Sequence, residues 1–166
     1  KKLVLSRTFE TPVTEEFSAG LSFQNACTKY PDNFVFICHT PETGTWLGCS
    51  PEVLLSGGNS RWKTVALAGT KKVTSKEENI SWDNKNYTEQ KIVVEYMKQQ
   101  LQDASISFNY NEPVTSYSGN IAHLKSEFTF NINDSEKITS LLSLLPPTPA
   151  VCGYPKQEAY DFIIRN

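Results

Sequence analysis

The chain has 166 residues, of which 39% are hydrophobic and 20% are charged, and this composition is ordinary for a globular domain with a core of useful size. Its 16 basic and 18 acidic residues are interleaved and give a net charge of −2, which argues against a nucleic-acid partner. No apolar run approaches the roughly 20 residues that span a bilayer, so we expect no membrane partner.

Apolar periodicity and turn residues predict the secondary structure in chain order. The longest predicted helix, 83–102, has the clearest periodicity. Several strands, few short crossovers and late helices favour an α+β fold with an antiparallel sheet. No repeat or linker divides the chain, so we expect one continuous unit. The predicted elements are a strand at 3–9, a helix at 15–30, a hairpin at 34–38 and 45–49, a strand pair at 53–56 and 62–67, a helix at 83–102, strands at 106–110, 114–117 and 127–131, and helices at 135–144 and 156–166.

The four cysteines have no CxxC spacing, and each stands among apolar or small neighbours. In a chain of this length they do not form a disulfide framework. We therefore expect buried free thiols and a cytoplasmic protein. These cysteines are Cys27, Cys38, Cys49 and Cys152.

Glu89 lies on the expected inward stripe of the long helix, four residues before Val93. An inward carboxylate is costly unless it is paired or binds a metal. The alternative is a partly solvated carboxylate in the first helical turn, which the helix dipole favours. Taken alone, Glu89 fits the second interpretation better.

Glu52 follows Ser50-Pro51, where a predicted strand ends and the chain turns back. Such places often hold active-site groups, although an N-cap or a turn hydrogen bond is the better explanation of Glu52 taken alone. Gly69 and Thr70 form a corner at the end of another strand, before two lysines. This corner could admit an anion to backbone amides, or it could be an ordinary strand exit.

His123 lies in a β-type stretch, where a single histidine is more often structural than a ligand. His39 has no plausible partner in the sequence, so we expect no metal site built on histidine. The sequence also has no phosphate-binding loop, zinc-ligand spacing or nucleophile elbow. Taken one at a time, the candidate residues indicate no function.

Their order and spacing are more informative. Together these motifs resemble those of the chorismate-binding enzymes, which include isochorismate, salicylate, anthranilate and aminodeoxychorismate synthases. The resemblance covers nearly the whole chain, is closest to the isochorismate synthases, and implies the anthranilate synthase component I-like fold. The last motif is the most specific. In chain order the motifs are Lys2-Leu-Val-Leu-Ser-Arg7, Gly48-Cys-Ser-Pro-Glu52, Leu67-Ala-Gly-Thr70, Lys85-x3-Glu89-x3-Val93 and Pro147-Thr-Pro-Ala-Val-Cys-Gly153-Tyr-Pro155.

The resemblance implies an isomerase that converts chorismate to isochorismate by adding water, for menaquinone or siderophore biosynthesis. It implies that Lys2 is the general base that activates water, and that Glu52 is the general acid that protonates the departing hydroxyl. It also implies that Glu89 ligates Mg²⁺, which holds the ring carboxylate of the substrate. The substrate-binding residues it implies are Gly69, Thr70, His123 and Ala150.

The chain departs from the family at Gln90 and Pro146, where relatives usually have histidine. The family also continues with a Gly-Ala-Gly-type strand, an arginine, a tyrosine and a second glutamate for the metal. We therefore expect residues 1–166 to be a partial domain, truncated at the C-terminus and also at the N-terminus, and inactive by itself. The last helix reaches the final residue without a stop signal, which fits truncation or a frayed end.

Alternatives remain. Salicylate synthase shares the lysine and adds pyruvate elimination, and a non-catalytic relic or a binding module of this fold is also possible. Anthranilate-type synthases are disfavoured, because amine-adding relatives usually have glutamine at the position of Lys2. We expect the parent protein to be a monomer, whereas exposed strand edges could cause the fragment to self-associate.

Overall fold

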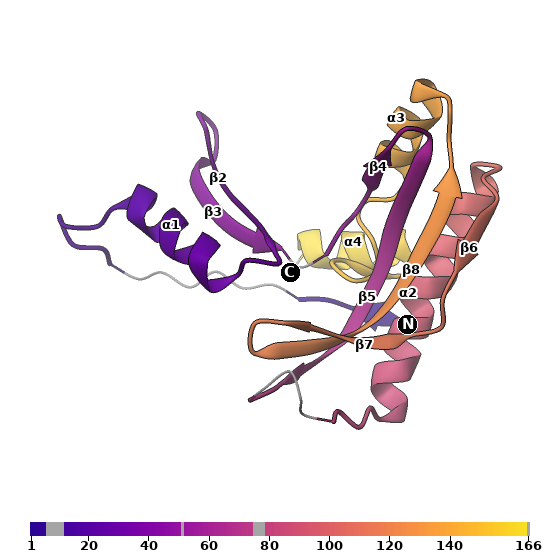
Figure 1. Ribbon diagram of the computed structural model, residues 1–166, viewed down its shortest axis with the longest axis horizontal. Helices are drawn as coiled ribbons and strands as arrows, with labels where there is room; N and C mark the ends of the chain where they lie inside the picture. Colours follow the sequence, from indigo (N-terminus) through magenta and orange to yellow (C-terminus); the bar gives the residue numbers. More distant parts are fainter. Residues whose placement is uncertain (6–11, 51, 75–78, 166) are drawn as a thin grey trace. The chain divides into compact units, whose positions relative to one another are not determined.

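The computed structural model describes residues 1–5, 12–50, 52–74 and 79–165. The chain divides into two compact units (Figure 1). The larger unit comprises Lys1–Ser6 and Val53–Asn166, and the smaller comprises Arg7–Glu52. This differs from the single continuous unit expected from the sequence, which has no linker composition at the boundary.

Within the described residues, the larger unit is organised around a five-stranded antiparallel sheet with the order β4-β5-β8-β6, in which β7 also pairs with β8 (Figure 1). The α+β class predicted from the sequence is confirmed. The strands are β4 (Ser56–Gly58), β5 (Arg61–Lys72), β6 (Phe108–Tyr110), β7 (Val114–Ser118) and β8 (Ile121–Asn131).

The two central strands are longer than their sequence patterns predicted. β5 continues past Ala68 because a bulge absorbs Gly69, and pairing with β8 resumes at Thr70. The strand predicted at 53–56 is displaced to β4. The reason is the position of the turn, since Asn59 and Ser60 have φ values of 50° and 69°.

Helix α2 (Asn84–Asp103) covers one face of this sheet (Figure 1). Its N-cap is Asp83, whose Oδ1 accepts a hydrogen bond of 2.8 Å from Asn86 N. The predicted apolar stripe is confirmed, and it packs against small and aromatic side chains of β5 and β8. The buried cluster includes Val93, Tyr96, Met97 and Leu101 from α2, with Ala66, Ala68, Phe128 and Phe130 from the sheet.

A polar side chain joins the helix to both central strands. Gln90 is fully buried, and its Nε2 donates to Ala66 O at 2.9 Å and lies 3.4 Å from Ser126 Oγ. The Nε2 is thus satisfied by hydrogen bonds, whereas Gln90 Oε1 is buried without a hydrogen-bond partner among the described residues. Gln90 thereby fixes α2 against β5 and β8.

The rest of the larger unit comprises β1, α3, β9, α4 and the loop 145–152, which we call the proline-rich loop. Helix α3 (Ser135–Leu144) matches the predicted bounds, and α4 (Lys156–Arg165) follows the short pair of β1 (Lys2–Leu3) with β9 (Gly153–Tyr154). Tyr96 Oη donates to Leu145 O at 2.8 Å, and Lys156 Nζ donates to Pro146 O at 2.6 Å. These bonds hold the proline-rich loop against α2.

The smaller unit contains α1 (Ala19–Lys29) and the predicted hairpin, formed by β2 (Phe34–Thr40) and β3 (Gly44–Ser50). The helix begins later than predicted because Ser18 caps it, accepting from Leu21 N at 3.2 Å. Of the strand predicted at 3–9, Leu3 lies in β1, whereas residues 6–11 lie outside the described residues.

The prediction of buried thiols is wrong for three cysteines. Cys27, Cys38 and Cys49 are free and exposed, and Cys152 is free and buried. The three exposed cysteines all belong to the smaller unit, where no residue among 12–50 and 52 is buried. One helix and a two-stranded hairpin cannot enclose a core.

Across residues 1–5, 12–50, 52–74 and 79–165, no helix combines the length and the apolar character that crossing a membrane requires.

Candidate functional site

The bulge between β5 and β8 brings Gly69, Thr70 and His123 together. His123 Nδ1 lies 3.2 Å from Gly69 O and 3.1 Å from Thr70 Oγ1. A proton on Nδ1 would be donated to the Gly69 carbonyl, whereas a proton on Nε2 would let Nδ1 accept from the Thr70 hydroxyl. Three residues that the sequence singled out separately therefore form one corner.

His123 presents an unsatisfied nitrogen at this corner. Its Nε2 is buried and has no hydrogen-bond partner in the described part of the chain. Burial lowers the pKa of His123 below its ordinary value of 6.5, and the hydrogen bond to Gly69 O opposes this shift. The imidazole is therefore neutral at pH 7, and the hydrogen-bonding capacity of its Nε2 is used by no described residue.

Gly69 joins this corner to the first turn of α2. Its φ of +65° lies in the left-handed region, and a Cβ there would lie 3.3 Å from Asn86 Cβ and 3.5 Å from Trp82 Cζ3. Only glycine takes this conformation at low cost. The backbone of β5 thus approaches the helix that carries Glu89.

Glu89 does not occupy the inward position predicted for it. Its side chain is 31% exposed and lies 3.8 Å from Lys85 Nζ in an i,i+4 ion pair. The next residue, Gln90, is the buried one, so Glu89 lies at the edge of the apolar stripe. This partly solvated setting is the alternative considered for Glu89 from the sequence.

Two oxygen atoms near the start of α2, from Glu89 and Asn86, are of the chemical type that binds a hard cation. Asn86 precedes Glu89 by three residues and so shares its helix face, and Asn86 Oδ1 is buried without a hydrogen-bond partner among the described residues. Amide and carboxylate oxygens are ligands of Mg²⁺. Sequence reasoning missed Asn86, although its spacing from Glu89 was available. Across the described residues no group of three His, Cys, Asp or Glu side chains is placed to hold a metal.

Lys2 and Ala150 lie in a second segment of the larger unit. Lys2 is half-buried on β1 and pairs with Tyr154 of β9. Gly153 packs so closely on Lys2 O that a Cβ would collide with it. Ala150 is partly buried against the core cluster. The β1–β9 pair therefore fixes the backbone of Lys2 near the proline-rich loop.

Glu52 is the last residue of the smaller unit and lies outside its helix and strands. Its backbone N–H donates to Ser50 Oγ at 3.3 Å, which is the turn hydrogen bond considered from the sequence. Ser50 Oγ is also 3.3 Å from Glu52 O. The structure thus brings Gly69, Thr70 and His123 into direct contact, and the contacts between Ser50 and the Glu52 backbone are local.

Comparisons with known proteins agree on one family. A family model described as "Chorismate binding enzyme" matches residues 1–166. The isochorismate synthase EntC of Escherichia coli K12 is 28% identical over 98% of this chain and 44% of its own length. The chloroplastic isochorismate synthase of Catharanthus roseus is 31% identical over 99% of this chain and 30% of its own length.

Solved structures give the same result for the fold. The menaquinone-specific isochorismate synthase MenF of Escherichia coli superposes with a TM-score of 0.72 at 26% identity, covering 89% of this chain and 36% of that chain. The chain therefore spans less than half the length of these relatives.

We expect Gly69→Ala to destabilise the larger unit by roughly 1–2 kcal/mol, because alanine is strained in the left-handed region and would crowd Asn86. Urea unfolding measures the change. Gly58→Ala is the matched control, since a Cβ there meets nothing within 4 Å. Equal effects of the two substitutions would contradict the close approach at Gly69.

We expect NMR titration to place the pKa of His123 below 6.5 in the folded protein. The unfolded chain then takes up this proton first, so stability is full above about pH 6.5 and is lost as pH falls through the folded pKa. Urea unfolding at several pH values would detect this loss. His123→Gln should reduce the dependence of the free energy of unfolding on pH. A folded pKa at or above 6.5 would exclude this account of the corner.

Proposed function

Because the chain belongs to the family of chorismate-binding enzymes, we propose that it carries part of the active site of an isochorismate synthase. The observation that supports this most directly is the corner at Gly69, Thr70 and His123, where Nε2 of His123 is buried and has no hydrogen-bond partner among the described residues. The relatives EntC and MenF, both named isochorismate synthases, support the reaction.

The substrate and the product of the proposed reaction, chorismate and isochorismate, differ in the position of one ring hydroxyl. Water adds at one ring carbon while a hydroxyl leaves another, and the ring double bond shifts between them. Lys2 would accept the proton of the attacking water, and Glu52 would give its proton to the departing hydroxyl, which leaves as water. A poor nucleophile and a poor leaving group require such a base and acid.

The corner would bind the ring carboxylate. The bulge leaves Thr70 exposed, so an anion could approach its hydroxyl, while Asn86 and Trp82 pack against Gly69 beside it. The neutral His123 imidazole would add a hydrogen bond without contributing charge. Ala150 would contribute a small side chain to the pocket wall, which leaves room for the ring.

We further propose that Mg²⁺ takes part, with Glu89 as a ligand and Asn86 as a supporting oxygen donor. The cation would supply positive charge to the substrate carboxylate. In its absence, Lys85 neutralises Glu89 from 3.8 Å. To bind Mg²⁺, Glu89 would have to leave its ion pair with Lys85. This costs little, because an exposed ion pair contributes little to stability.

Salicylate synthase remains the second enzyme candidate, because the resemblance gives it the same base at Lys2. Product analysis separates the two, since accumulation of isochorismate without salicylate excludes pyruvate elimination. The product could feed menaquinone or siderophore synthesis, and the relatives include one protein named for menaquinone.

We expect Lys2→Ala in the full-length protein to reduce formation of isochorismate by about 10²–10⁴-fold, the contribution of a general base, while chorismate still binds. Chromatography of the products and a binding titration measure the two effects. Lys1→Ala is the control, because Lys1 is an exposed neighbour paired with Glu158 at 2.8 Å. Undiminished turnover by the Lys2 variant would remove Lys2 from the mechanism.

We expect Glu89→Gln to raise the Mg²⁺ concentration for half-maximal turnover by about tenfold or more, because the neutral amide is a weaker ligand. Glu95→Gln on the same helix is the control, since Glu95 is exposed and pairs with Lys98 at 3.0 Å. Rates measured across a Mg²⁺ series decide the question, and identical curves for the two variants would exclude Glu89 as a ligand.

A further inference from the structure

Lys2, the base of the proposed reaction, lies on a strand that pairs with a segment distant in the sequence. β1 runs antiparallel to β9, with Lys2 opposite Tyr154. Further along β1, Val4 N donates to Cys152 O at 3.0 Å. Within the described residues β1 pairs with no strand other than β9, so the position of its backbone depends mainly on β9.

Both β1 and α4 lie close against Gly153. Its φ of +134° is one that a residue with a side chain rarely adopts, and a Cβ there would collide with Lys2 O and lie 3.1 Å from Leu3 Cα. The same Cβ would lie 2.9 Å from Ala159 Cβ on α4. Position 153 therefore has no room for a side chain, and only glycine lets β1 approach this closely.

The elements on which Gly153 packs are anchored more firmly than β1 is. Ala159 is buried, and at the start of α4 Lys156 Nζ donates to Pro146 O at 2.6 Å. Directly before β9, Cys152 N donates to Thr148 O at 3.1 Å. β9 and α4 are thus tied to the proline-rich loop, whereas β1 is two residues long. A side chain at position 153 would therefore displace β1 more easily than β9 or α4.

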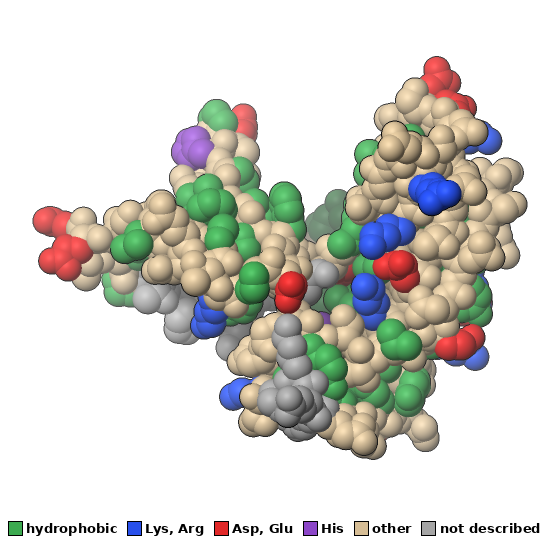
Figure 2. All heavy atoms as spheres, viewed as in Figure 1, with side chains coloured by type: hydrophobic (Ala, Val, Ile, Leu, Met, Phe, Trp, Pro, Cys, Tyr) green, Lys and Arg blue, Asp and Glu red, His purple; other side chains and the backbone are tan. Residues whose placement is uncertain are grey.

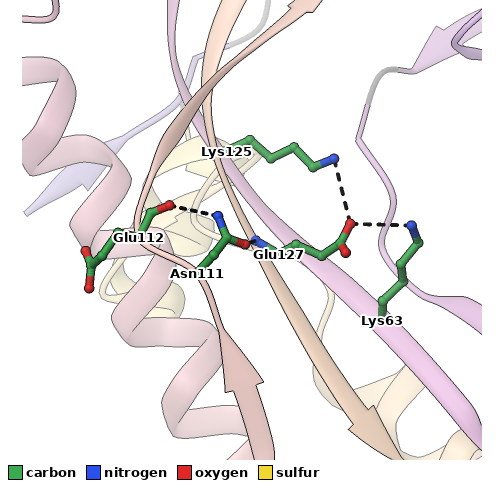
Figure 3. A network of polar contacts seen from close by, with 5 residues as sticks. All are labelled: Lys63, Asn111, Glu112, Lys125 and Glu127. Carbon is green, nitrogen blue, oxygen red and sulfur yellow. Dashed lines mark hydrogen bonds and ion pairs between the residues drawn. The ribbon is translucent and has the colours of Figure 1, made fainter.

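Other lysines of the larger unit are held in a different way. Figure 2 shows lysine and arginine side chains at the surface over β5 and β8. Figure 3 shows two lysines of these strands, Lys63 and Lys125, whose Nζ atoms lie 3.4 Å and 3.8 Å from Glu127 Oε2. Such partly exposed ion pairs constrain a side chain only weakly. The contact at Gly153 acts instead on the backbone of Lys2.

We propose that Gly153 and Ala159 are positioning residues for Lys2, which set the place from which its Nζ reaches the attacking water. Relief of the collision at position 153 would require the Lys2 backbone to move by roughly 1 Å, and a misplacement of that size can lower a rate by about 10²-fold. Neither residue needs to contact the substrate. The inference rests on the proposed role of Lys2 as the general base.

The test measures kcat and KM for isochorismate formation by the full-length protein, in the wild-type and in the Lys2→Ala background. Gly153→Ala adds the colliding Cβ. Ala159→Val enlarges the neighbouring side chain without changing the residue at position 153, so it decides the question if Gly153→Ala does not fold. Gly44→Ala is the matched control, because Gly44 also has a positive φ, +77°, but a Cβ there meets nothing within 4 Å.

We expect Gly153→Ala to lower kcat by about 10–100-fold and Ala159→Val to lower it several-fold, with little change in KM. Gly44→Ala should leave kcat unchanged. In the Lys2→Ala background neither substitution should lower the residual turnover further, because both act through Lys2.

Three results would overturn the inference while leaving Lys2 as the base. They are equal fold-losses of kcat in the two backgrounds, an unchanged kcat for both Gly153→Ala and Ala159→Val, and a raised KM at unchanged kcat. Full turnover by the Lys2→Ala protein has a different meaning, since it contradicts the proposed role of Lys2 and the inference falls with it.

Discussion

The pairing of β5 with β8 is the constraint on which the rest of the larger unit depends. It runs from Arg61 opposite Asn131 to Lys72 opposite Ile121, with one bulge beside Gly69. Because antiparallel pairing fixes which side chains share a face, this ladder presents small and aromatic residues to α2 and polar ones to the other side. The bulge shapes the candidate chorismate corner.

Two buried polar contacts hold the surrounding elements in register with that ladder. Gln90 donates to Ala66 O from a position where the resembled family usually has histidine, so the departure retains a hydrogen-bond donor inside the core. Tyr96 donates to Leu145 O and thereby holds the loop that leads to Ala150. Each bond is modest in net energy, but leaving either buried group unpaired would be costly. The two hydrogen bonds therefore fix where α2 and the loop lie more than they add to the free energy of unfolding.

The charges at the Gly69 corner are few and partly compensated. At the Gly69 corner, burial keeps His123 neutral, and the nearest carboxylate identified with function, Glu89, is partly solvated and paired.

Local periodicity and motif order by themselves determined the α+β class, the bounds of α3, the apolar stripe of α2 and the resemblance to chorismate-binding enzymes, because these depend on spacing within short segments. Only the tertiary structure decided which residue of α2 is buried, Gln90 rather than Glu89, and that Cys27, Cys38 and Cys49 are exposed. It also joined His123 to Gly69, 54 residues away. Burial and long-range contacts depend on what packs against a segment. The residue pattern of one strand does not predict which other strand it pairs with.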